Sequence, residues 1–126
     1  MPTNSRQSSK ADREALSSLK GVAAFAELST TNLKLLAKET ESVEVKRGEA
    51  LIKAGDKADS LFIVSRGRFM VLMDNEPIAE IDVGEPVGEL GFFANTIRTA
   101  DVVATRSSQV LELSRSSFER LNRKMP

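Results

Sequence analysis

A glutamate and an arginine nine positions apart are the residues of this chain whose types and spacing best support chemistry. Glu89 follows Gly88, and Arg98 precedes Thr99 and Ala100. A glycine lets a ligand approach the backbone closely, and a helix that begins there presents free N–H groups to an anion. A guanidinium can bind two phosphate oxygens in parallel, whereas a carboxylate beside a phosphate is suited to a sugar hydroxyl. The segment therefore indicates an anion site.

Each of these residues also has an explanation that involves no ligand. A Glu in the first turn of a helix interacts favourably with the helix macrodipole. Gly88 and Gly91 could be turn residues, and Arg98 could pair with Asp101 on the surface. Composition and spacing do not choose between these readings. By themselves they support an anion site in a β-rich domain and nothing more specific.

The composition excludes several kinds of catalytic and metal site. The chain has 126 residues, the size of one domain with its own core. It contains no Cys and no His, which excludes disulfides, thiolate and imidazole metal ligands, and a Ser-His-Asp triad. The side chains that remain available for chemistry are carboxylates, Lys, Arg and hydroxyls. A binding domain without a metal is favoured over an enzyme.

The charges say little about the partners of this chain. Eighteen Lys and Arg balance eighteen Asp and Glu, and no basic stripe suited to nucleic acid is visible. The basic residues Lys46, Arg47, Arg115, Arg120, Arg123 and Lys124 are interpreted as solvated edges. The apolar runs are much shorter than the ~20 residues of a membrane span, and the polar N-terminus does not resemble a signal peptide. We therefore expect a cytoplasmic protein.

Hydrophobic periodicity predicts helices, then many short strands, then a helix. Residues 1–10 are expected to be a disordered lead-in and residues 11–126 one domain. Helices are predicted over 11–19, ending at Gly21, and behind the N-cap Ser29. Strands are predicted at 43–45, 51–52, 60–65, 69–73, 78–81, 100–104 and 109–113. Ser114 is predicted to cap a last helix with Phe118 and Leu121 on one face. This order is typical of a mainly β fold with flanking helices, an antiparallel β-roll or jelly-roll-like barrel.

Residues 84–99 break the strand pattern. Pro86 is expected to end the preceding strand, because proline has no N–H for the ladder. Residues 89–93 can form one helical turn, with Asn95 as the left-handed residue at its end. The residues of the candidate anion site fall in this stretch or directly after it.

Two motifs in this order resemble a known family. Gly88-Glu89-Leu90 followed by Arg98-Thr99-Ala100 is similar to the phosphate-binding cassette of cyclic nucleotide-binding domains, which occur in kinase regulatory subunits, cyclic nucleotide-gated channels and bacterial catabolite activators. The upstream residues Gly48, Ile52, Gly55, Asp56, Asp59, Phe62, Ile63, Val64 and Gly67 also match the family's recurring glycines and strand positions. The resemblance covers roughly residues 22 to 122.

The resemblance implies a role for each residue of the cassette. Gly88, Leu90 and Gly91 would offer backbone N–H groups, and Glu89 would hold the ribose 2′-OH of cAMP or cGMP. Arg98 would bind the cyclic phosphate, and Thr99 and Ala100 would add amides or a hydroxyl. Val87, Ile97 and Asp101 depart from the family's usual Phe, Pro and Thr. A carboxylate at Asp101 could compete with the phosphate for Arg98.

The resemblance also implies a regulatory module that passes ligand binding to an attached effector. The lid helix and the effector are expected to lie outside these 126 residues, the effector on the C-terminal side. An alternative is a β-roll that has lost its ligand and serves as a docking or dimerisation domain. A third interpretation, a cupin-like enzyme, requires histidine ligands that the chain lacks.

Overall fold

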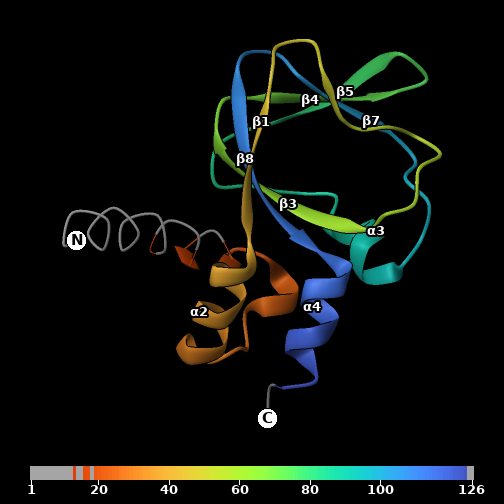
Figure 1. Cartoon of the computed structure of the whole chain (residues 1–126). Helices are drawn as coiled ribbons and strands as arrows, with labels where there is room; N and C mark the ends of the chain where they lie inside the picture. The colour runs from red at the N-terminus through yellow and green to blue at the C-terminus, as the bar shows by residue number, and fades with distance from the viewer. Residues whose placement is uncertain (1–12, 14–15, 18, 125–126) are drawn as a thin grey trace.

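The computed structural model describes residues 13, 16–17 and 19–124, and its strands form two antiparallel sheets of four strands each (Figure 1). One sheet has the order β1-β8-β3-β6 and the other β2-β7-β4-β5. The strands are β1 (Glu41–Val45), β2 (Ala50–Ile52), β3 (Ser60–Arg66), β4 (Phe69–Met73), β5 (Glu76–Ile81), β6 (Pro86–Val87), β7 (Asp101–Ala104) and β8 (Ser108–Ser114). The predicted mainly β roll with flanking helices is confirmed.

The helices flank the sheets. They are the 3-10 helix η1 (Ala23–Phe25), α2 (Thr30–Glu39), α3 (Glu89–Ala94) and α4 (Arg115–Asn122). Both predicted caps are present, since the Ser29 hydroxyl accepts a hydrogen bond from the Asn32 N–H (3.1 Å) and Ser114 accepts one from Ser117 (3.2 Å). In Figure 1, α2 and α4 lie together on one side of the sheets, and α3 lies beside α4.

The predictions at the N-terminus are tested only in part. The expected lead-in over 1–10 lies outside the described residues. Of the helix expected over 11–19, Arg13, Leu16, Ser17 and Leu19 are helical and the other positions lie outside the described residues. Leu19 is fully buried, which anchors this segment to the core.

Strand β3 separates two hydrophobic clusters. Leu61 and Ile63 pack on the helical side, and Phe62 and Val64 pack between the sheets. Alternate residues of a strand point to opposite faces, so a strand buried on both faces reads as a continuous apolar run. The run from Leu61 to Val64 has this form and places β3 at the centre of the fold.

One strand contradicts the expected role of Pro86. Pro86 begins β6, in which it pairs with Ile63 and Val87 pairs with Phe62. Because β6 is the edge strand of its sheet, a proline there can turn its nitrogen, which has no N–H, to the side on which no strand pairs. The chain therefore re-enters the sheet immediately before Gly88.

Candidate functional site

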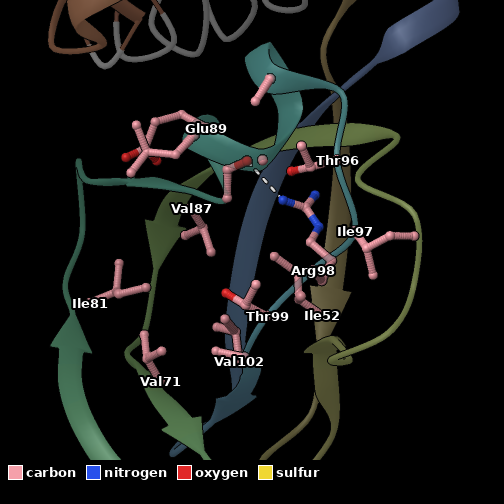
Figure 2. A pocket seen from close by; sticks show the side chains of 15 residues that line it. Ile52, Val71, Ile81, Val87, Glu89, Thr96, Ile97, Arg98, Thr99 and Val102 are labelled. Carbon is pink, nitrogen blue, oxygen red and sulfur yellow. Dashed lines mark hydrogen bonds between the residues drawn. The ribbon is translucent and has the colours of Figure 1, made fainter.

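A cavity of about 470 Å³ opens between the segment that carries the candidate residues and the strands facing it. The residues lining it are Ile52, Val71, Ile81, Val87, Gly88, Glu89, Leu90, Gly91, Ala94, Thr96, Ile97, Arg98, Thr99, Ala100 and Val102 (Figure 2). All seven residues singled out from the sequence are in this set. The structure thus brings the two halves of the motif together around one space.

Gly88 forms the junction between β6 and α3. Its φ of 74° is left-handed, and a Cβ at this position would lie 2.3 Å from Nη1 of Arg98. A side chain is therefore excluded both by the backbone conformation and by the neighbouring guanidinium. At the other end of α3, Asn95 is also left-handed, with φ 56°, and its N–H caps the helix by donating to Gly91 and Phe92 carbonyls, as predicted.

Arg98 is buried, with 8% of its surface exposed. Its Nη1 donates to the Gly88 carbonyl (2.7 Å) and its Nη2 to the Ser60 carbonyl (2.5 Å). Burial, and then the charge of Arg115, lower the pKa of Arg98, while Asp59 and Glu89 act in the opposite direction. The guanidinium is thus a partly desolvated cation held against the start of α3 (Figure 2).

Asp101 does not form the surface pair with Arg98 that the sequence left open. Its Oδ1 accepts a hydrogen bond from the Ala54 N–H (2.7 Å), on the turn that follows β2. The two donors of Arg98 that form hydrogen bonds have carbonyl partners instead. The carboxylate therefore fastens a backbone turn.

The rest of the cavity wall is aliphatic. Val71, Ile81, Val87 and Val102 form a wall facing the polar groups (Figure 2). None of the residues that line the cavity is aromatic. Thr99 lines the same space with an exposed side chain and brings a hydroxyl next to the aliphatic wall. The cavity therefore combines one charged end with a non-polar surface of the kind that buries a flat organic group.

The family model described as the cyclic nucleotide-binding domain matches residues 42–124, which include both halves of the motif. The chain belongs to the cyclic nucleotide-binding domain family. The resemblance inferred from the motif is thus confirmed at the level of the family.

Individual proteins similar to this domain are found in several organisms. An uncharacterized NTE family protein of Mycobacterium tuberculosis is 32% identical over 119 residues, which cover 94% of this chain and 20% of that protein. A cyclic nucleotide-binding-like protein of Brucella abortus superposes with a TM-score of 0.79 at 27% identity, over 87% of this chain and 98% of that one. A cAMP-bound structure of PfPKA-R superposes with a TM-score of 0.74 at 29% identity, over 90% of this chain and 40% of that one. The chain spans a fifth of the length of the mycobacterial relative.

Arg115, the first residue of α4, is a residue of this domain that sequence reasoning placed wrongly on a solvated edge. Its Nη2 donates to the carbonyls of Ala58 and Phe92, at 2.6 Å each, and its guanidinium carbon lies 4.6 Å from the centre of the Phe92 ring. Its Nε lies 3.7 Å from Asp59 Oδ1. The acceptors are 57 and 23 residues away in the chain, so no local pattern could reveal them.

Four phenylalanines extend this contact between α3 and the other helices. Phe93 packs edge-on against Phe25 of η1 at 5.4 Å and against Phe118 of α4 at 5.9 Å between ring centroids. Phe92 also packs against Phe118, at 5.6 Å. Edge-to-face geometry is favoured for aromatic pairs, beyond the area that they bury. The short helix beside the cavity is therefore in direct contact with the C-terminal helix.

The described residues contain neither a metal-binding cluster nor a membrane-spanning helix. No group of three or more His, Cys, Asp or Glu side chains there could hold a metal ion. No helix there is long and apolar enough to span a membrane.

Proposed function

We propose that this domain binds a cyclic purine nucleotide, cAMP or cGMP, in the 470 Å³ cavity, and that binding regulates an attached effector. The observation that carries the proposal is the position of Arg98. Among the residues that line the cavity it is the one basic side chain, and it is buried against Gly88. A cyclic phosphate that enters a largely desolvated pocket requires a matched cation, and Arg98 supplies one.

Each residue of the cassette has a proposed role in this binding. Arg98 pairs with the cyclic phosphate, and the carboxylate of Glu89 accepts a hydrogen bond from the ribose 2′-OH. Backbone N–H groups of Gly88, Leu90 and Gly91, together with Thr99 and Ala100, complete the polar contacts. The aliphatic wall around Val71 and Ile81 receives the base.

The identity of the base is the finer part of the proposal. Apolar burial against aliphatic side chains accepts any purine, and Thr99 offers one hydroxyl that could reach a guanine amino group in a syn base. One such hydrogen bond contributes about 0.5–1.5 kcal/mol net, so discrimination through it stays near tenfold. We therefore propose that both nucleotides bind, with cAMP as the physiological ligand.

Calorimetric titration with cAMP, cGMP and unmodified AMP tests the proposal. Saturable one-site binding of the cyclic nucleotides supports it, with AMP as the control for a non-cyclic phosphate. Absence of heat with either cyclic nucleotide, confirmed by unchanged thermal unfolding at saturating concentration, contradicts it. The alternative would then apply, a β-roll that serves as a docking or dimerisation domain. The hydrogen bonds from Nη1 and Nη2 of Arg98 to carbonyls are the observation that favours this second candidate.

A further inference from the structure

The exposed turn that follows β2, residues 53–57, is hydrogen-bonded to the segment between α3 and β7 that carries Arg98. Gly55 donates its N–H to the Arg98 carbonyl (2.9 Å), and the Arg98 N–H donates to the Asp56 carbonyl (2.7 Å). A third bond, from the Ala54 N–H to Asp101 Oδ1 (2.7 Å), is made by a side chain. The first two bonds hold the backbone of Arg98 from both sides, and the third holds the turn that makes them.

The turn is also held by a bond from the Asp56 N–H to the Lys53 carbonyl (3.2 Å) and by a bridge between Lys57 and Ile97. All five of its residues are exposed, and Gly55 has a left-handed φ of 96°, with open space around the position of a Cβ. Exposed segments with few buried apolar contacts open locally at low free energy. Of the three bonds named above, the one from Ala54 is the one accepted by a side chain, so a substitution at Asp101 removes it without changing the backbone.

We propose that Asp101 is a positioning residue for Arg98. Its carboxylate accepts a hydrogen bond from the Ala54 N–H and so orders the turn. The ordered turn fixes the backbone of Arg98, from which the guanidinium reaches the Gly88 carbonyl. Asp101 acts through the turn and not on the ligand. This inference rests on the proposed function, because the consequence of positioning Arg98 is read as nucleotide affinity.

The proposal and simple electrostatics predict opposite changes in cyclic nucleotide affinity when the Asp101 carboxylate is removed. A carboxylate three residues from Arg98 would repel a phosphate, so its removal would tighten binding if charge alone mattered. If Asp101 orders the turn, Asp101→Ala weakens cyclic nucleotide binding by about threefold to tenfold, the usual contribution of one hydrogen bond. Asp101→Asn keeps an oxygen acceptor for Ala54, loses the charge, and is expected to stay within about twofold of the parent.

The experiment measures cAMP affinity by calorimetry for the parent, Asp101→Ala, Asp101→Asn and the control Glu76→Ala, which removes an exposed carboxylate from the start of β5. Weaker binding by Asp101→Ala, with recovery in Asp101→Asn and no change in the control, supports the proposal. Unchanged or tighter binding by Asp101→Ala overturns it. Equal losses in Asp101→Ala and Asp101→Asn also overturn it, because they show that the acceptor is not what matters.

A second measurement needs no ligand and separates this inference from the proposed function. Amide hydrogen exchange and the ¹⁵N-NMR signal of Arg98 Nε are recorded for the same four proteins in the free state. Faster exchange at Gly55 and Arg98 and a shifted Nε signal in Asp101→Ala alone support positioning, even if the parent binds no cyclic nucleotide. Spectra identical to those of the parent overturn it, even if the parent binds tightly.

Discussion

The two ends of the cavity, one around Arg98 and the other around Val71 and Ile81, are built in different ways. Arg98 is buried and held through side chain and backbone by Gly88, Ser60 and the turn after β2. Val71 and Ile81 lie on β4 and β5, are only partly buried, and present carbon alone to the cavity.

Under the proposed function, the end around Arg98 would recognise the charge of the phosphate, and the end around Val71 and Ile81 would recognise the shape of the base. A fixed donor fork on a buried arginine sets a stringent geometric requirement, whereas an aliphatic surface accepts any flat group of suitable size. We therefore expect changes at the charged end to affect affinity strongly, and changes at the aliphatic end to affect the choice of base weakly.

The largest effect is expected for Arg98→Ala. Truncation leaves the phosphate without its cation, which costs about 2–5 kcal/mol, or roughly thirtyfold to several-thousandfold in affinity. Arg98→Lys should recover only part of this, because an ammonium does not form the two-pronged contact. Calorimetry measures both variants. Parent-like affinity of a folded Arg98→Ala variant would show that the charged end is not the binding end.

The same variant also tests the stability of the fold. Because Arg98 is buried, its removal is expected to lower the free energy of unfolding. A solvent-facing arginine would leave the fold unaffected, but Arg98 donates to the carbonyls of Gly88 and Ser60. We expect its loss to destabilise the domain by about 1–3 kcal/mol, because both carbonyls lose a donor, although the Gly88 carbonyl still accepts from the Phe92 N–H. Chemical unfolding of the free protein gives this value, and a loss of stability too small to measure would contradict the role of these two bonds.

A pair of glycine variants gives the next largest effect. Gly88 and Gly84 both have positive φ, 74° and 90°, but a Cβ on Gly88 would meet Arg98 Nη1 at 2.3 Å while a Cβ on Gly84 would meet open space. Both alanine variants share a backbone strain of about 1–2 kcal/mol. Gly88→Ala alone should displace the guanidinium and reduce cyclic nucleotide affinity at least about tenfold. Equal affinities of the two variants would contradict close packing at the charged end.

A smaller effect, a change in amide hydrogen exchange on ligand binding, is expected in α4, at a distance from the cavity. Arg115 and Phe118 connect α4 to α3, so ligand contacts at α3 should change amide exchange in residues 115–124. Coupling of this kind is typically about 1–3 kcal/mol and reciprocal. Exchange mass spectrometry with and without saturating cAMP measures it, with β1 as an internal control outside the cavity wall. If exchange changes in α3 but not in α4, the domain binds the ligand without transmitting binding to its C-terminal helix.

The smallest effect is expected for Thr99→Ala at the junction with the aliphatic end. Loss of one hydroxyl should change the ratio of cGMP to cAMP affinity by no more than about tenfold, at 0.5–1.5 kcal/mol for a single hydrogen bond. Parallel titrations of the parent and the variant with both nucleotides give the ratio. A ratio that does not change would remove Thr99 from base recognition.

Local signals predicted much of the fold. Both serine caps, the left-handed Asn95 and the span of β4 depend on side chains or backbone preferences near in sequence, and the structure has each of them as expected. The seven cassette residues came from the family resemblance, and they line one cavity. What the cassette residues bind stays a prediction.

Contacts between distant segments could not be read in the same way. The sequence predicts a solvated Arg115 because its acceptors are carbonyls, which every residue has and which therefore leave no trace in the sequence. The type of Pro86 predicts the end of a strand, and only the strand order shows that it lies at an edge. The bond from Ala54 to Asp101 spans 47 residues and likewise required the fold.

The cluster of Phe25, Phe92, Phe93 and Phe118 has an optical consequence. The chain contains no Trp and no Tyr, so it has essentially no intrinsic emission in the range where indoles fluoresce. Phe93 lies at the meeting point of α3, η1 and α4 and is 38% exposed, which leaves room at the edge of its ring. A single tryptophan introduced by Phe93→Trp would be the sole indole of the domain. Its emission would report the packing of α3 against α4 without background from any other side chain.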